Sequence, residues 1–520
     1  MEQPSGYPIG QQDFKTLRDM NCIFVDKTNF IEKLIISKAQ YYFLARPRRF
    51  GKSLFLSTLR YFFEGEKRLF KGLHIDSMDW DWAEYPVLHL DLNTERYATT
   101  DKLSDVLLDL FGKWEKKYGI EGMGNTNPPQ RFKNIIETAY AKTGRQVVIL
   151  VDEYDKPLVN NLNRPEQFDH YREDLAAVYS NFKTCAECIR LVFITGVSRF
   201  SKLTVFSGLN NLKDITFTDE YADICGITSD ELLEYFKPGI EEIAKRYKVG
   251  FNEMLIKLKN AYDGYRFSGE GSDIYNPWSL LNCLNDKYIS YYWNETGIPT
   301  IVAETLKKLD IDLQELFDDT ACTLQDLQGM DITTPNPVAL MYQTGYLTIK
   351  DFHFNSGTYL LGVPNEEVRD GLVKVLIPYY VDLKNTKDPS LINNLITRLN
   401  LGQPQKFMTA IQAYFAGITY KLKMDNENNF HNAFFLLTSL IGLNTQAEFS
   451  TSDGSIDMLI RTDSYTYVIE LKYDGTAQAA LQQIDSKEYA LPFTADHRKI
   501  FKIGVNFSSE KRRIIDWIIE

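Results

Sequence analysis

The feature that most constrains this chain is a short loop that ends in Gly51-Lys52-Ser53. An apolar run at residues 41–45 precedes the loop, and an apolar-periodic segment at 54–63 predicts a helix after it. Glycine lets several backbone N–H groups converge on an anion at the start of a helix. Lys52 supplies a charge for terminal phosphates, and Mg²⁺ accepts a hydroxyl such as that of Ser53. The order of strand, loop and helix therefore predicts a phosphate-binding loop in a parallel α/β sheet.

A second apolar run, residues 147–151, ends in Asp152 and Glu153. A continuous apolar run is expected for a strand that is buried on both faces. At the end of this strand Asp152 would bind Mg²⁺, and Glu153 would lie beside the attacking water. The alternative is a buried strand that ends in a solvated acidic turn. Because the loop and the acidic pair occur together in this order, the nucleotide site is favoured.

Further nucleotide contacts are expected from the loop and from a later strand end. Against the G-x-x-x-x-G-K-[ST] pattern, Arg46 replaces the first glycine. Arg199 follows a strand predicted at 191–195, and it either senses the terminal phosphate, in this subunit or a neighbour's, or is a surface arginine. The predicted cofactors are ATP and Mg²⁺. The residues expected to contact the nucleotide are Arg46, Arg49, Phe50, Gly51, Lys52, Ser53, Asp152 and Arg199.

The length and composition favour a globular protein with more than one core. The chain has 520 residues, 44% of them apolar and 25% charged. Strand and helix signals alternate in residues 1–225, which predicts a parallel sheet covered by helices. The further signals are strands at 87–92 and 215–217 and helices at 102–117 and 130–143.

Charge and cysteine usage limit the environment and the partners. The net charge of −12 argues against a histone-like binder but allows a local basic groove. Six scattered cysteines fit a reducing compartment. Because no leader pattern and no membrane-length apolar run is found, we expect a cytoplasmic protein without a membrane segment.

Residues 226–380 read as mainly helical, with one predicted hairpin. Its strands are expected at 345–350 and 358–363, around Asn355-Ser356-Gly357, and Asn365 is expected to cap the following helix. Helices with one hairpin fit a winged-helix module, although this packing is generic.

The last segment, residues 381–520, contains a second chemical constellation. Two antiparallel strands are predicted around a tight turn at Asp463-Ser464, which pairs position 462 with 465 and places Asp457 opposite Glu470. Alternation puts Lys472 on the same face as Glu470. Facing carboxylates cost up to ~1 kcal/mol unless a cation lies between them, and oxygen ligands suit Mg²⁺ or Mn²⁺. Lys472 would orient or deprotonate a water for attack on a phosphodiester.

Other side chains complete this predicted site. Gln483 and Tyr489 lie six apart in and after the next predicted helix, and Glu448 precedes the hairpin as a further carboxylate. The alternative is a half-exposed acidic hairpin with a salt-bridged lysine. The aspartate opposite Glu470 and the following helix favour a catalytic site.

With both sites placed, the chain resembles AAA-ATPase-like proteins that carry a C-terminal PD-(D/E)xK nuclease domain. In such proteins an arginine at the position of Arg46 is usual. The resemblance implies a P-loop NTPase parallel sheet and a C-terminal α/β restriction-endonuclease-like domain. Between them it implies a helical middle region, for which a winged helix is one alternative. The segments that carry the resemblance are 24–28, 43–53, 151–157, 195–202, 206–212, 262–267 and 275–278.

The resemblance also implies roles for individual residues. The nuclease positions carried over are Asp457, Glu470, Lys472 and Gln483. By similarity to STAND-type NTPases, the Asn276-Pro277 turn borders the adenine.

These observations lead to three hypotheses about function. The first is an ATP-controlled, metal-dependent nuclease that acts on DNA or RNA, with catalytic Glu153, Asp457, Glu470, Lys472 and Gln483. The second is a nucleotide-dependent switch whose nuclease-like domain grips nucleic acid without cutting it. The third is an ATPase with an inert remnant domain. The sequence leaves open whether the chain forms a homo-oligomer.

Overall fold

The computed structural model divides the chain into two compact units. One comprises Met1–Glu295 with Ala321–Glu367, and the other comprises Thr296–Thr320 with Val368–Glu520. The three-part division at residues 225 and 380 stays a prediction. The structure describes residues 6–520 apart from 96, 98, 100, 121–126, 163, 200–204, 207, 208, 210, 294–301, 303–305, 307–311, 319, 329–335, 381–388, 417–426, 440–443, 452 and 453.

The first unit contains a five-stranded sheet in the order β2-β3-β4-β1-β5, and all of its strand pairs are parallel. Every residue of β1 and β3 is buried, and for β3 this was predicted from its apolar run. The strand predicted at 215–217 was wrong in position, because β5 forms two residues earlier. The strands are β1 Tyr41–Ala45, β2 Val87–Asp91, β3 Val147–Asp152, β4 Ile189–Gly196 and β5 Lys213–Asp214.

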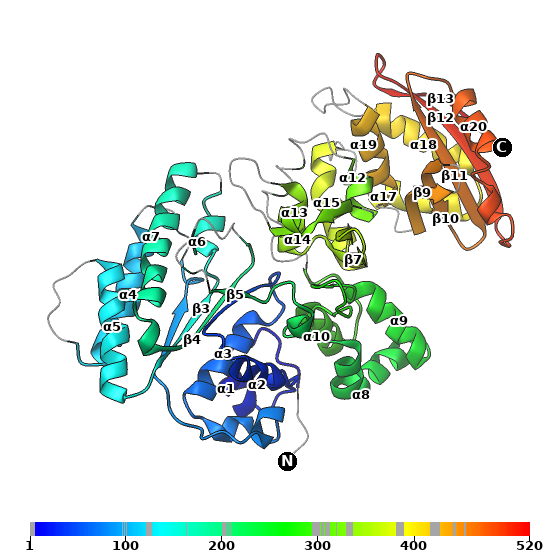
Figure 1. Cartoon of the computed structure of the whole chain (residues 1–520). Helices are drawn as coiled ribbons and strands as arrows, with labels where there is room; N and C mark the ends of the chain where they lie inside the picture. Colours follow the sequence, from blue (N-terminus) through cyan, green and yellow to red (C-terminus); the bar gives the residue numbers. More distant parts are fainter. Residues whose placement is uncertain are drawn as a thin grey trace. The chain divides into compact units, whose positions relative to one another are not determined.

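Helices cover both faces of this sheet, which explains its continuous apolar strands. Figure 1 shows α4, α5 and α7 on one side and α1, α2 and α3 on the other. The predicted helices at 54–63, 102–117 and 130–143 are confirmed. The bounds are α1 Phe14–Asp19, α2 Thr28–Ile36, α3 Lys52–Phe63, α4 Lys102–Lys117, α5 Pro128–Thr143, α6 Lys156–Val159 and α7 Pro165–Thr184, with 3-10 turns at Lys67–Phe70, His74–Ser77, Ala186–Cys188 and Asp219–Tyr221.

Three further helices of this unit share an apolar core. They are α8 Ser229–Tyr247, α9 Phe251–Tyr262 and α10 Pro277–Asp286. Helix α8 begins at a capping box in which Thr228 and Glu231 bond each other's backbone N–H groups. Short bridges join Ile227 to Tyr275 and Tyr265 to Ile274.

The predicted hairpin forms, although its first strand begins and ends three residues later than expected, and it belongs to a three-stranded sheet in the order β6-β8-β7. Strand β6 was not predicted from the sequence. A short helical segment followed by a hairpin whose second strand is central fits a winged-helix module, which stays a prediction. Asn365 donates its side-chain amide to the carbonyl of Asp263 at 2.8 Å. The bounds are α12 Leu313–Asp318, β6 Thr320–Thr323, α13 Leu324–Gln328, α14 Pro337–Thr344, β7 Thr348–His353, β8 Thr358–Gly362 and α15 Glu366–Tyr380.

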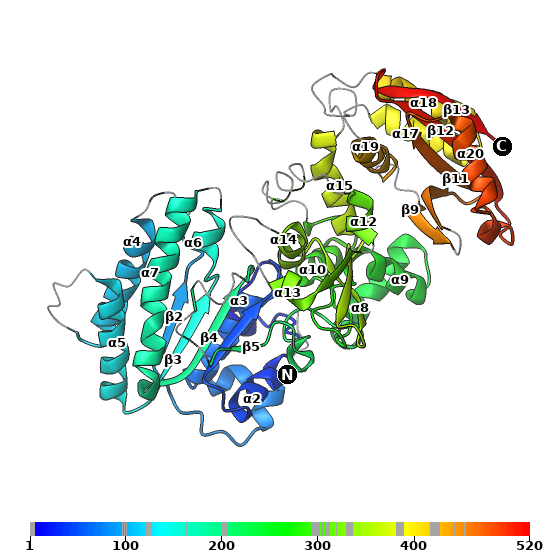
Figure 2. The same ribbon diagram turned by 45° about the horizontal axis from the view of Figure 1, so that its top comes forward.

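The second unit is built on a mixed sheet in the order β13-β12-β11-β10-β9, in which β11 and β12 are parallel and joined through α20. Val468 packs with Leu481 of α20, whereas its neighbour Tyr467 donates to the Leu399 carbonyl of α17, so helices cover both faces (Figure 2). The bounds are α17 Pro389–Asn400, α18 Pro404–Ala416, α19 Glu427–Ser439, β9 Asn444–Thr451, β10 Gly454–Arg461, β11 Tyr465–Tyr473, α20 Ala477–Ser486, β12 Lys499–Ser508 and β13 Arg513–Ile519, with a 3-10 turn at Leu491–Phe493.

The approach of α20 to the sheet depends on Gly504, which is in register with Glu470. A Cβ at this position would lie 2.3 Å from the Ala477 carbonyl oxygen and 2.7 Å from the Leu481 nitrogen. Both are backbone atoms of the helix, so they cannot move aside singly. We predict that Gly504→Ala lowers the free energy of unfolding of the second unit by about 1–3 kcal/mol, measured by denaturant unfolding.

The matched control is Gly112→Ala in α4. Its Cβ would meet only the Arg131 guanidinium, at 3.8 Å. This change should raise stability slightly, by at most about 1 kcal/mol, because alanine favours a helix interior. A Gly504→Ala protein as stable as the parent would contradict the packing described.

Candidate functional site

The loop at residues 46–51 joins β1 to α3 and is shaped by two left-handed residues, Arg49 at φ 70° and Gly51 at φ 96°. Lys52 opens α3 and is buried. Its Nζ donates to the carbonyls of Arg46 at 3.0 Å and Pro47 at 3.1 Å, and lies 3.5 Å from Glu153 Oε1. The Lys52 charge therefore lies under the loop and beside the acidic end of β3.

Asp152 is the last residue of β3 and is buried. The Thr195 hydroxyl of β4 donates to Asp152 Oδ1 at 2.6 Å. Asp91 is its register partner on β2, and burial and the nearby Asp152 charge raise the pKa of Asp91. Glu153 follows in the left-handed conformation at φ 53°, which is rare outside glycine and recurs at functional sites. The predicted pair Asp152 and Glu153 thus lies with Lys52 at the carboxyl edge of the sheet.

The turn after Glu153 binds the loop that follows β4, a role that was not predicted from the sequence. Asp155 is buried and accepts hydrogen bonds from the backbone N–H groups of Val197, at 3.1 Å, and Ser198, at 2.5 Å. Burial, with the Glu153 charge, raises the pKa of Asp155 to about 6. The Tyr154 hydroxyl donates to the Ser198 carbonyl at 3.0 Å. Both partners lie in segments singled out from the sequence, but no local pattern specifies that they bind each other.

Two arginines that were expected to contact the nucleotide bind protein groups in the structure. The Arg46 guanidinium is 1% exposed and donates to four backbone carbonyls. These belong to Ala45 at 2.9 Å, Thr216 at 2.7 Å, Tyr221 at 3.0 Å and Ala222 at 3.4 Å. We therefore expect the Arg46 side chain to stabilise the loop by binding these carbonyls.

Arg199 is also buried. Its Nε lies 2.6 Å from Asp214 Oδ2, and its backbone N–H donates to Gln343 Oε1 at 2.8 Å. The ion pair joins the loop after β4 to β5. The predicted phosphate contact of Arg199 remains a prediction, and this pair would compete with it.

An apolar pocket adjoins the 46–51 loop. Pro277 is the first residue of α10, which Asn276 caps through its side chain at 3.1 Å. Lys27 also reaches the pocket and is paired with Glu231 at 2.5 Å. The pocket is lined by Pro8, Leu17, Ile23, Phe24, Val25, Lys27, Phe50, Gly51, Leu54, Phe55, Thr58, Ile224, Cys225, Gly226, Ile227, Phe236, Pro277 and Leu281. Its apolar walls suit a flat ring.

The same loop contacts the helical part of the unit. Phe50 packs edge-on against Tyr265, with centroids 4.7 Å apart, and Phe267, at 5.2 Å. The Arg49 guanidinium lies over the Trp278 ring at 4.0 Å and donates to the Tyr292 carbonyl at 3.2 Å. The motifs at 262–267 and 275–278 are therefore the partners of the loop.

The second constellation forms at the centre of the other sheet. The predicted register is confirmed, since Met458 pairs with Ile469 and Arg461 with Thr466. Asp457 Oδ2 accepts the backbone N–H of Leu471 at 2.7 Å. Lys472 Nζ donates to Glu470 Oε1 at 3.2 Å. The structure thus brings two carboxylates and one amine together.

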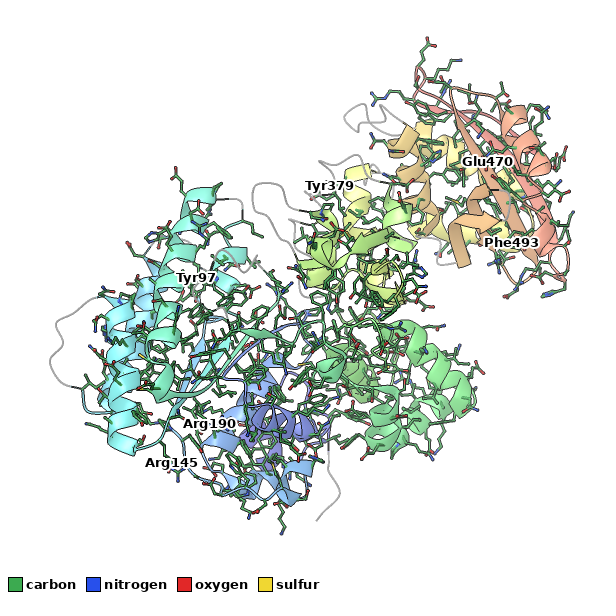
Figure 3. The ribbon with its side chains drawn as sticks, viewed as in Figure 1. Tyr97, Arg145, Arg190, Tyr379, Glu470 and Phe493 are labelled. Carbon is green, nitrogen blue, oxygen red and sulfur yellow. The ribbon has the colours of Figure 1, made fainter. Side chains whose placement is uncertain are left out.

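Glu470 lies inside the second unit and is 1% exposed (Figure 3). Its Oε2 is buried and has no hydrogen-bond partner among the described residues. Burial, with the charge of Asp457, raises the pKa of Glu470 to about 7. A buried carboxylate with a free oxygen suits a cation, because a bound cation would satisfy that oxygen.

The remaining predicted residues have mixed outcomes. Gln483 is partly exposed on α20, between Leu481 and Ile484, which pack onto the sheet. Tyr489 is buried in that apolar cluster, so it contributes packing. The side chain of Glu448 lies outside the described residues. Ser53 is partly exposed in the first turn of α3.

Two features are absent from the part of the chain that the structure describes. It contains no group of three or more His, Cys, Asp or Glu side chains placed to hold a metal ion. None of its helices combines the length and the apolar character needed to cross a membrane.

Comparison with known proteins assigns families to both regions. Residues 8–206 match the model of a predicted AAA-ATPase, and residues 425–517 match the PD-(D/E)XK nuclease superfamily. An uncharacterized protein in the vnfD 5′ region of Azotobacter chroococcum mcd 1 is 33% identical over 99% of this chain and 98% of its own.

Solved structures give only a weak similarity. The Aeropyrum pernix ORC2 protein is 10% identical with a TM-score of 0.24, and covers 70% of this chain and 91% of its own. Cdc6p from Pyrobaculum aerophilum is 11% identical with a TM-score of 0.23, and covers 68% and 91%. Scores this low carry no argument about this chain. From the two family models and the relative aligned along the whole length, the chain belongs to the family of predicted AAA-ATPases that carry a C-terminal PD-(D/E)XK nuclease-superfamily domain.

Proposed function

We propose that this protein is a metal-dependent nuclease whose activity is controlled by ATP bound in the first unit. The observation that carries the nuclease proposal is the Asp457, Glu470 and Lys472 cluster, with Lys472 Nζ 3.2 Å from Glu470 and Asp457 held by the Leu471 N–H. The substrate is the phosphodiester backbone of DNA or RNA.

The residues fit a divalent cation, either Mg²⁺ or Mn²⁺. The buried Oε2 of Glu470 is the oxygen that such a cation would satisfy, with Asp457 as the second carboxylate. When bound, the cation supplies a polarised phosphoryl oxygen and a more acidic water. Leu471 keeps the Asp457 side chain oriented through its N–H. Lys472, with a side chain 31% exposed, would orient that water or accept its proton.

The nucleotide site is supported by the carboxyl edge of the first sheet. The Lys52 ammonium would exchange the loop carbonyls for the terminal phosphates of ATP. Ser53 and Asp152 would hold Mg²⁺, with Thr195 orienting Asp152. Glu153 would act as the general base for hydrolysis.

The adenine base is proposed to enter the apolar pocket beside Gly51 and Pro277. Control would begin at Phe50 and Arg49, since these loop residues contact Tyr265, Phe267 and Trp278. A nucleotide that moves the loop would thereby also move the helical part of this unit.

The variant Lys52→Ala tests the nucleotide site. We expect ATP affinity to fall by at least about tenfold, because a charge-assisted contact to phosphate contributes roughly 1.5–3 kcal/mol. Titration calorimetry with ATP and Mg²⁺ measures this loss. The control is Lys113→Ala, an exposed lysine paired with Asp109 on α4. Normal ATP binding by Lys52→Ala would exclude the assigned nucleotide site. If cutting by Lys52→Ala still depended on ATP, regulation through this site would be excluded.

The variant Lys472→Ala tests the nuclease site. We expect metal-dependent cleavage of DNA or RNA to fall by about 10²–10⁴-fold, the range for loss of a positioned proton-transfer group, while ATP binding stays unchanged. Gel assays of labelled substrates with Mg²⁺ or Mn²⁺ measure the rate. The control is Lys502→Ala on β12, a lysine that pairs with Asp485.

The outcome also separates this proposal from the switch hypothesis. Undiminished cutting by Lys472→Ala would remove the assigned site. If the parent protein binds nucleic acid without cutting it and Asp457→Ala has no effect, the nucleotide-dependent switch is the better description.

A further inference from the structure

The basic turn, as we call the three consecutive basic residues Lys511-Arg512-Arg513, comprises the last two residues between β12 and β13 and the first residue of β13. It lies at the same edge of the second unit's sheet as Lys472. Because β11 and β12 are parallel, their carboxyl ends meet at one edge, and Lys472 is in register with Asn506. Strand β12 ends at Ser508, two residues later, and the basic turn follows.

Hydrogen bonds fix the residues just before the basic turn to the end of β11. The backbone N–H of Ser509 donates to Asp474 Oδ1 at 2.8 Å. The Asn506 side chain accepts from the Gly475 N–H at 3.0 Å and donates to the Gly475 carbonyl at 2.8 Å. Asn506 and Ser509, which precede the basic turn, are thus tied to Asp474 and Gly475, the two residues that follow Tyr473.

The separation matches the spacing of a nucleic-acid backbone. Strands lie ~4.8 Å apart and rise ~3.3 Å per residue, so the backbone of the basic turn lies on the order of 10–15 Å from that of Lys472. One strand of nucleic acid advances about 3.4 Å per phosphate. A strand bound at Glu470 and Lys472 would therefore pass the basic turn a few nucleotides away.

The charges of Lys511 and Arg513 in the basic turn are available for a polyanion. Lys511 and Arg513 are exposed, and neither takes part in an ion pair found among the described residues of this unit. By contrast, Arg498 and Lys502 are paired with carboxylates. Glu510, the acidic residue that directly precedes Lys511, is exposed.

The overall charge makes such a local patch necessary. The chain carries a net charge of −12, which repels nucleic acid at long range. Contacts to phosphates would then come from a local basic surface, because a charge more than ~10 Å from a phosphate is largely screened at 0.1 M salt.

We propose that the Lys511-Arg512-Arg513 turn binds the phosphate backbone of the strand that enters the Glu470 and Lys472 site. This contact carries no base specificity and acts on DNA and RNA alike. It rests on the proposed nuclease function, and it adds the surface that holds the substrate.

The test is a charge reversal in the full-length protein, K511E/R512E/R513E. The matched control, K406E/K487E/K499E, changes the net charge equally at three exposed lysines. Lys499 starts β12 at the opposite edge of the sheet, Lys487 follows the end of α20, and Lys406 lies on α18. Binding of labelled single-stranded DNA, duplex DNA and RNA is followed by anisotropy in EDTA, so that no cutting occurs.

We expect the reversal to weaken binding of all three probes by at least about tenfold. The slope of log affinity against log salt should fall by roughly 0.9 for each duplex phosphate that the protein no longer neutralises, or by roughly 0.7 for each phosphate of a single strand. The control should stay close to the parent. A milder variant, K511Q/R513Q, should show part of the same decrease in slope, and it serves if the reversal impairs folding.

Equal weakening in both triple variants, unchanged binding in the reversal, or no binding by the parent would each overturn this inference. Cleavage assays with Mg²⁺ or Mn²⁺ test the nuclease proposal separately. A parent that binds through the basic turn but cuts nothing keeps this inference and removes catalysis. A parent that cuts nucleic acid but binds it equally well without the charges of the basic turn keeps the nuclease proposal and removes this inference.

Discussion

The nucleotide site of the first unit and the position of the basic turn in the second depend on one constraint, the parallel pairing of strands that are distant in sequence. Parallel strands bring their carboxyl ends to a common edge, so whatever follows them meets there. In the first unit β1 and β3 flank β4, which places Lys52, Asp152 and Thr195 together. In the second unit the pairing of β11 with β12 places Lys472 beside Asn506. Gly504 allows α20 to close over that pair.

The parts of the structure that could be predicted from the sequence are set by local rules. The hairpin register follows from the position of its turn, and Thr462 bonds Tyr465 across Asp463-Ser464 as expected, with the Thr462 N–H donating at 2.9 Å. The buried strand at 147–151 follows from its unbroken apolar run. The position of Asp152 follows from the buried strand, and the positions of Glu470 and Lys472 follow from the hairpin. The place of each residue in its own site could therefore be predicted.

The destinations of long side chains could not be predicted. Arg46 ends on carbonyls of Thr216 and Tyr221, and Arg199 ends on Asp214, and these partners are fixed only by tertiary packing. An arginine in a loop looks the same in sequence whether it meets a phosphate or a carbonyl. The two-residue strand β5 was misplaced for a related reason, since so short a segment has no periodicity of its own.

The carboxylates of the two sites are held in different ways, and the difference bears on function. Asp152 and Asp457 each accept a hydrogen bond on a carboxylate oxygen, from the Thr195 hydroxyl and from the Leu471 N–H. Glu470 has Lys472 on one oxygen and no partner among the described residues on the other. Leaving a buried oxygen unsatisfied costs stability, so such an atom in a well-packed sheet needs an explanation. A cation bound at the proposed nuclease site would supply one, whereas a purely structural role for the Glu470 and Lys472 pair would not.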